Sequence, residues 1–225
     1  MKVLFVLLAI AFLGSYASAE GGFLFTTFRD ETTPMSEQIY MGISQDGRHW
    51  DALNDGNPVL VSDVGEKGVR DSFLLRSHDG HKVWLIATDL SVARNSDWKR
   101  ATHQGSRSIV VWETSQNLMG PWQPMPQFTA GQGKNFEGPL CYRLPDATNG
   151  QSVWCLMLDN VSDRIGRGAF GYMPFISNDL STGQFTPASD FHFPYPFRHG
   201  SVLPITTAER QRLETAYSAS QNARD

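Results

Sequence analysis

The chain repeats itself at intervals of about 60 to 70 residues, and this repeat restricts its fold more than any other feature. Two copies are closely alike, because Val83–Asp89 and Val153–Asp159 both begin with Val-Trp and end with Asp. A third copy, Leu24–Asp30, keeps the terminal Asp. Apolar, aromatic and β-branched residues dominate these short runs, as is typical of β-strands. The repeat therefore predicts an all-β protein built from similar units.

Two further elements recur in the same order around these strands. The preceding strand opens on a charged or polar residue in each copy, at Asp71–Arg76, Glu137–Tyr142 and His199–Pro204. A later strand, expected at 38–43, 108–114 and 172–176, leads into a polar turn and then an aromatic residue. Together these pieces predict a four-stranded antiparallel meander, which is the blade of a β-propeller. A β-sandwich with coincidentally similar strands is the alternative.

The two ends of the chain complete each other. Residues 22–53 supply the later strands of a blade without its first strand, and residues 199–205 supply a first strand alone. We therefore expect one domain over residues 20–225, in which the N- and C-terminal strands share a blade. About three blades are present, whereas closed propellers have about four to eight. An open arc, association with a second copy and an incomplete gene product are the interpretations that this count allows.

The first 19 residues have the form of a secretory signal peptide. Lys2 is followed by an apolar run and by the small residues Ala-Ser-Ala at 17–19. The apolar run is shorter than the roughly 20 residues that a membrane-spanning helix needs. We expect a mature protein that begins at Glu20 and is secreted. The formal charge of the full chain is −4, and with no cluster of Lys or Arg it disfavours nucleic acid and anionic membranes as partners.

The strand-opening residues Asp71, Glu137 and His199 are the candidates for chemistry. The innermost strands of a propeller line its central channel, so equivalent positions on different blades should converge there. Two carboxyl groups on rigid strands suit glycoside hydrolysis, which needs an acid for the departing oxygen and a base or nucleophile at the sugar carbon. A single Asp or Glu in such a place more often begins a strand or turn. The shared register of the two favours a functional pair.

These residues also carry a family resemblance. The segments Val69–Leu74, Phe136–Pro139 and Phe197–Ser201 resemble the blade-opening motifs of glycoside hydrolase family 43, the five-bladed arabinofuranosidases, xylosidases and arabinanases. The resemblance extends over residues 23–213. It implies a carbohydrate substrate, namely arabinose- or xylose-containing plant polysaccharide.

The resemblance also implies roles for the candidate residues. Hydrolysis would proceed with inversion, with Asp71 as general base and Glu137 as general acid, their carboxyl groups roughly 6.5 to 9.5 Å apart. This mechanism requires no cofactor. His199 would match a histidine that helps to hold a central ion such as calcium, often through water. An ordinary packed or hydrogen-bonded histidine is the alternative.

Two departures separate the chain from the family pattern. Ser72 stands where members usually have Pro, which leaves Asp71 in place. Between Trp112 and Ser115 the chain passes directly from a first-blade strand to a late-blade ending, so roughly two blades are absent. One of them carries the aspartate that normally orients the acid, and losing this negative charge should weaken Glu137 as an acid. A catalytically weak or inactive remnant that binds carbohydrate or protein is therefore the alternative to an active enzyme.

Other residues are candidates for contacts with sugar hydroxyls. Asn160 and Arg198 stand beside expected channel-lining positions. Asp30, Asp89 and Asp159 end equivalent strands and would either bind hydroxyls or cap turns, with turn capping the more common role. Trp98 would stack on a sugar ring or cover the core.

Cys141 and Cys155 are the only two cysteines of the chain. They lie on successive strands of one expected hairpin and are symmetric about Thr148. This spacing favours a cross-strand disulfide, which the oxidising compartment of a secreted protein allows. Two buried thiols are the alternative.

Overall fold

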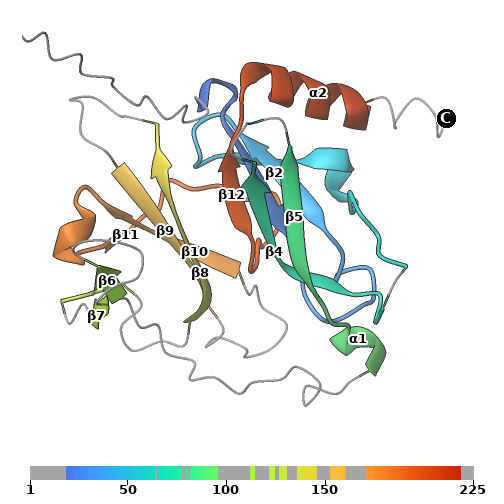
Figure 1. The fold of residues 1–225 in the computed structure, drawn as a ribbon, viewed down its shortest axis with the longest axis horizontal. Coiled ribbons are helices and arrows are strands. Elements are labelled where there is room, and N and C mark those ends of the chain that lie inside the picture. The colour runs from blue at the N-terminus through green and yellow to red at the C-terminus, as the bar shows by residue number, and fades with distance from the viewer. Residues whose placement is uncertain are drawn as a thin grey trace, which may run out of the picture.

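The computed structural model describes residues 19–63, 65–77, 80, 82–95, 112–114, 122–124, 127–130, 136–145, 153–160 and 171–218. In these ranges the chain is an all-β protein of antiparallel sheets with two α-helices (Figure 1). Neither of these helices has the length and apolar character needed to cross a membrane. Residues 1–18 of the expected signal peptide, Trp98 and Ser115 lie outside the described residues.

The first sheet joins the two ends of the described chain. Its four strands lie in the order β12 (Ser201–Pro204), β1 (Phe23–Thr27), β2 (Tyr40–Ser44) and β3 (Trp50–Ala52). All neighbours are antiparallel, so β12 is the first strand of a meander that β1 to β3 continue. Two 3-10 helices flank it, η1 (Ala19–Gly21) and η2 (Leu53–Gly56), and the helix α2 (Thr207–Ser218) follows β12.

The second four-stranded sheet is a meander in sequence order. Its strands are β8 (Phe136–Leu144), β9 (Val153–Asn160), β10 (Gly171–Ser177) and β11 (Thr186–Pro187). A 3-10 helix, η3 (Leu180–Thr182), connects β10 to β11, and the Asp179 carboxylate caps it by accepting a hydrogen bond from the Ser181 N–H. The four-strand unit predicted from the repeat is therefore present in two sheets of the molecule.

The remaining strands form two separate pairs. β4 (Val69–Arg76) pairs with β5 (Val83–Asp89), which leads into the short helix α1 (Val92–Asn95). β6 (Trp112–Thr114) pairs with β7 (Trp122–Pro124). The sequence predicts one blade from all four strands, and this prediction is wrong for the described residues, because neither β6 nor β7 pairs with β5. β6 and β7 pair with each other, and in the described residues β5 pairs only with β4.

The β12-β1-β2-β3 sheet packs between the β8–β11 sheet and the β4–β5 pair (Figure 1). Successive residues of a strand point to opposite faces. Phe25 of β1 therefore packs toward the β8–β11 sheet, with Tyr142, Met157 and Tyr172 in the same cluster. Leu24 points the other way, toward β4, in a cluster with Ile43, Leu53, Leu74 and Ile205. The three sheets stack face to face as propeller blades do, in an arc that does not close.

The predicted disulfide is wrong. Both cysteines are free, Cys141 exposed and Cys155 buried. In the β8–β9 register Cys155 lies opposite Tyr142, and Cys141 lies opposite Leu156. Residues opposite each other share a face and neighbours along a strand do not, so the two sulfur atoms are on opposite sides of the sheet. The hairpin is offset by one residue from the symmetric pairing that the sequence suggests.

We expect the stability of the protein not to depend on oxidation. The reagent DTNB should titrate both cysteines after unfolding without reductant, and dithiothreitol should leave the Tm unchanged. Cys141→Ser is the control, because it should remove one of the two reactive thiols and preserve the Tm. Absence of free thiols together with a lower Tm in dithiothreitol would contradict this register.

Phe25 is the residue whose loss should damage the core most clearly. It is fully buried and its ring contacts those of Trp50, Tyr172 and Phe197. Phe25→Ala should lower the free energy of unfolding by about 3–5 kcal/mol because it leaves a cavity. Val61→Ala, at a side chain that is 55% exposed, should change it by less than about 0.5 kcal/mol. Urea unfolding followed by circular dichroism measures both, and equal losses would refute the assignment of the core.

Candidate active site

A β-bulge lies at each of the two predicted catalytic carboxyl groups. The β4–β5 register shifts between Arg70 and Phe73, and the β8–β9 register shifts between Glu137 and Leu140. Asp71 has a φ of 50°, in the left-handed region, which costs a non-glycine residue on the order of 1 kcal/mol or more. A bulge turns a residue out of the ladder and re-aims its side chain. The two strands therefore present Asp71 and Glu137 in a similar way.

Gly138 allows the bulge of β8 to approach His199, which stands just before β12. Its φ is 52°, and a side chain at this position would overlap the imidazole ring of His199. The Tyr172 hydroxyl holds the approach in place, since it donates to the Gly138 carbonyl at 2.7 Å and accepts from the Gly200 N–H at 3.1 Å. A glycine is required here because the backbone of β8 lies directly against the ring.

Three carboxyl groups surround His199, which stands just before β12. Its Nδ1 lies 2.9 Å from Oδ1 of Asp71, within a hydrogen bond. Its Nε2 lies 3.2 Å from Oδ2 of Asp159 and 3.6 Å from Oε2 of Glu137, and both contacts are electrostatic rather than well-formed hydrogen bonds. The structure thus brings the three strand-opening residues to one small space between β4, β8 and β12.

The charges of this cluster depend on one another. Burial alone would lower the pKa of His199, but its contacts with Asp159 and Asp71 raise the pKa to about 9. Burial alone would likewise raise the pKa of Asp71, but the hydrogen bond with His199 and the positive charges of His199, Arg70 and Arg198 lower it below the ordinary value. At neutral pH an imidazolium therefore faces an ionised Asp71, whose side chain is 40% exposed.

An ion-pair network lies beneath the cluster. Nε of Arg198 donates to Asp159 at 2.9 Å, and Nη1 of Arg198 donates to Glu31 at 2.9 Å. Glu31 also accepts from Nη2 of Arg70 at 2.9 Å. The Arg198 side chain is only 1% exposed, so it contacts these carboxylates rather than the open side of the site. Nε of Arg198 therefore positions Asp159, and contact of Arg198 with a sugar remains a prediction.

Asp159 is the site residue whose position the sequence analysis missed. Its side chain is fully buried, and it lies directly opposite Glu137 in the β8–β9 ladder, on the same face. Asp89, its counterpart in the repeat, lies opposite Val69, two residues before Asp71. The sequence does contain a sign of this difference. The strand-opening residue and the terminal Asp of the next strand are 159 − 137 = 22 residues apart in one copy and 89 − 71 = 18 in the other. Different spacing moves the terminal Asp relative to the strand-opening residue.

The other predicted sugar ligands lie outside this cluster. Asp30 accepts hydrogen bonds from the N–H and the hydroxyl of Thr32, at 2.8 and 2.6 Å, and so caps a turn. Both oxygens of Asp89 accept from the Glu66 N–H, at 2.9 and 3.0 Å. Asn160 follows Asp159 and therefore points to the opposite face of β9, where its Nδ2 lies 3.5 Å from the sulfur of Met173. Sugar binding by these three residues remains a prediction.

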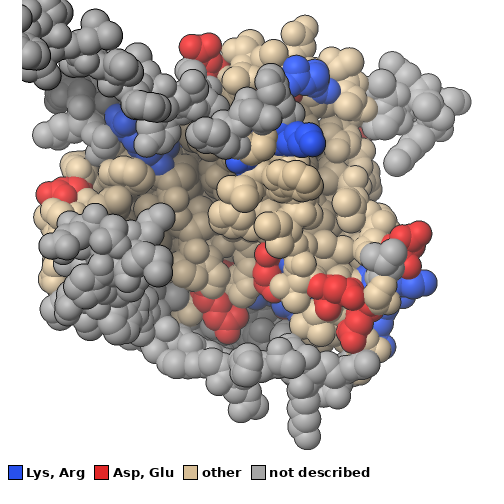
Figure 2. Space-filling model, viewed as in Figure 1, with Lys and Arg blue, Asp and Glu red and all other residues tan. Residues whose placement is uncertain are grey.

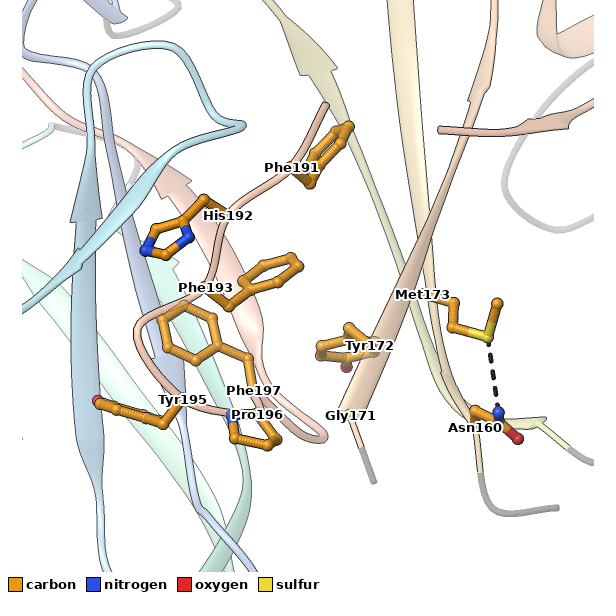
Figure 3. Close-up of a pocket in the computed structure, with 10 residues that line it drawn as sticks. All are labelled: Asn160, Gly171, Tyr172, Met173, Phe191, His192, Phe193, Tyr195, Pro196 and Phe197. Atoms are coloured by element: carbon orange, nitrogen blue, oxygen red, sulfur yellow. Dashed lines mark hydrogen bonds between the residues drawn. The ribbon is translucent and has the colours of Figure 1, made fainter. Parts of the chain in front are cut away.

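Asn160 also lines an aromatic pocket of about 510 Å³ (Figure 3). Residues from the segment before β12 lie across it from Tyr172 and Met173 of β10. Its lining is Asn160, Gly171, Tyr172, Met173, Phe191, His192, Phe193, Tyr195, Pro196 and Phe197. Asp and Glu are absent from this lining, so the pocket offers apolar and aromatic contact without a carboxyl group. The carboxyl groups of the candidate site lie instead in the cluster around His199.

The residues present do not fit a direct role for His199 as a calcium ligand. Nδ1 of His199 is already hydrogen-bonded to Asp71. Calcium prefers oxygen ligands. In the described part of the chain, no three His, Cys, Asp or Glu side chains are arranged to hold a metal ion. The central ion stays a prediction.

The antiparallel sheets stack as propeller blades do and bring two carboxyl groups to one histidine. Residues 19–124 and 114–211 match the protein family described as "Probable glycosyl hydrolase domain", which is related to glycoside hydrolase family 43. The chain belongs to this family. The two matched segments overlap at residues 114–124, next to the junction that the sequence places between Trp112 and Ser115.

One characterised relative is similar over a short stretch. An alpha-L-arabinofuranosidase of Bifidobacterium longum subsp. longum is 45% identical over 65 residues. These residues are 29% of this chain and only 6% of the relative. No solved structure matches the chain.

The charged state of His199 predicts how stability changes with pH. The pKa of this histidine is about 9 in the fold, above its ordinary value of 6.5. Its contribution is therefore complete below pH 6.5 and is lost as pH rises through 9. The free energy of unfolding should fall over this window by roughly 3 kcal/mol. Urea unfolding at several pH values measures this fall.

His199→Gln should remove this pH dependence, because glutamine does not titrate. The matched control is His192→Gln, at an exposed histidine that does not contact the carboxylates, and it should keep the fall. A His199→Gln protein with the same pH slope as the wild type would show that the imidazolium is not the cause.

Proposed function

We propose that this chain is a secreted glycoside hydrolase that releases arabinose or xylose from plant polysaccharide by inversion, with Asp71 as base and Glu137 as acid. Membership of the glycosyl hydrolase family supports cleavage of a glycosidic bond. The similarity to an alpha-L-arabinofuranosidase supports a pentose substrate. One observation supports the assignment of roles: two bulged strands place Asp71 and Glu137 beside the same histidine, His199.

Asp71 has the properties of a base that activates water. Its lowered pKa keeps it ionised at neutral pH, and its 40% exposed side chain leaves room for a solvent molecule. In an inverting reaction such a carboxylate takes a proton from the water that attacks the sugar carbon. The hydrogen bond from His199 to Oδ1 fixes the orientation of this carboxylate.

Glu137 is placed to donate a proton to the departing oxygen. Its side chain is 36% exposed, at the edge of the same space. The buried carboxylate of Asp159 lies opposite it in the sheet. We propose that Asp159 takes over part of the task of the aspartate that the missing blades would supply. The Arg198 guanidinium holds Asp159 in position.

The two roles predict different losses with different leaving groups. Asp71→Asn should reduce kcat at least about 10²-fold on both 4-nitrophenyl α-L-arabinofuranoside and an arabino-oligosaccharide. Glu137→Gln should reduce kcat about as much on the oligosaccharide. The reduction on the aryl glycoside should be much smaller, because nitrophenolate leaves without protonation. Stopped assays of pentose release measure these rates, with the aryl β-D-xyloside tested in parallel.

Asp51→Asn is the matched control, because Asp51 is exposed on β3 and contacts none of the site residues above. It should retain the wild-type rate on every substrate. If the wild type were as slow as the two site variants, the enzyme assignment would be wrong.

A carbohydrate-binding protein without turnover is the second candidate, and one observation favours it. Oδ1 of Asp71 is 2.9 Å from a positively charged imidazole ring, which weakens the carboxylate as a base. Titration calorimetry with arabino- and xylo-oligosaccharides separates the two functions. Heat of binding with no released pentose supports the binding protein, and released pentose supports the hydrolase.

A further inference from the structure

One face of the β4–β5 sheet carries large apolar side chains that nothing in the described chain covers. We call it the outer face, and define it by four residues that are 50–59% exposed: Phe73, Leu75, Trp84 and Ile86. The register pairs Phe73 with Ile86 and Leu75 with Trp84, so all four point the same way. The opposite face, with Leu74 and Leu85, packs on the β12-β1-β2-β3 sheet.

The outer face is large for the surface of a monomer. From the exposed fractions of two aromatic and two aliphatic residues, it presents on the order of 400 Å² of apolar surface. Charged side chains gather mainly around it in the space-filling view, where the surface over β4 and β5 is mostly uncharged (Figure 2). Lys82 stands at its border, with Nζ 5.8 Å from the centre of the Trp84 ring.

The other end of the arc differs, because its end face is covered. In the β8–β11 sheet the outward residues Phe136, Leu156, Leu158 and Phe175 pack with Phe128 and Ala130 of the segment 127–130. A head-to-tail contact between copies would have to displace this segment. A symmetric contact needs no displacement, since the outer face meets the same face of another copy.

We propose that the outer face of β4–β5 is the contact surface of a symmetric homodimer. Two outer faces stacked about a two-fold axis repeat the sheet-on-sheet packing that the three sheets of one chain already use. The apolar patches of both copies together supply about half of the roughly 1,600 Å² that a stable interface buries, and their rims can supply the rest. A sheet of only two strands is marginally stable without cover on its faces, so the contact also completes the layer that β4–β5 lacks.

Sedimentation equilibrium of the mature chain tests the proposal. The wild type should dissociate reversibly from dimer to monomer on dilution. Trp84→Lys should raise the dimer dissociation constant at least tenfold, because it places a charge at the centre of the contact. Val61→Lys, at a side chain that is equally exposed (55%) but lies outside the outer face, should leave the constant unchanged.

Circular dichroism checks that each variant is folded, and the milder Ile86→Thr replaces Trp84→Lys if that variant is not. A wild type that is monomeric at all concentrations overturns the proposal. So does a monomer whose β4–β5 amides are protected in hydrogen exchange, because a segment of the same chain would then cover the face. Equal weakening by Val61→Lys would place the contact elsewhere and overturns it too.

Discussion

The antiparallel pairing of β12 with β1 is the contact on which the site depends. It inserts residues from the end of the chain between sheets made by earlier residues, and so places His199 between β4 and β8. The Thr27 hydroxyl fixes the approach, because it donates to the Arg198 carbonyl and accepts from the Arg198 N–H. β1 also contributes to both cores, with Phe25 on one face and Leu24 on the other. A single strand thus holds the sheets of Asp71 and Glu137 at a fixed distance.

The ion pairs beneath His199 are buried, and burying these charges would lower the stability of the fold if any partner were missing. Arg198 and Asp159 are almost fully removed from water, and such charges each cost several kcal/mol when unpaired. Glu31 and His199 complete the pairing on either side. The benefit of this arrangement is that the charged side chains are held in fixed orientations.

The shortened propeller keeps the site because the site needs only innermost strands. β4, β8 and the approach to β12 supply Asp71, Glu137 and His199, and all three strands are present. Among the described residues, one end of the arc is a complete, covered blade and the other is a two-stranded one whose outer face is uncovered. The two ends therefore differ in what they can bind, although they derive from the same repeat.

The sequence by itself determined the strands, their order and the convergence of the strand-opening residues, because these follow from local composition and from repetition of one unit. It did not determine register. A one-residue offset in the β8–β9 register puts Cys141 and Cys155 on opposite faces. Asp159 lies opposite Glu137 and enters the site, whereas Asp89 lies opposite Val69, two residues before Asp71, and does not. The separate β6–β7 pair was equally unforeseen. Register was decided by bulges, turns and packing between residues far apart in the chain, and a shift of one residue moves a side chain to the other face of its sheet.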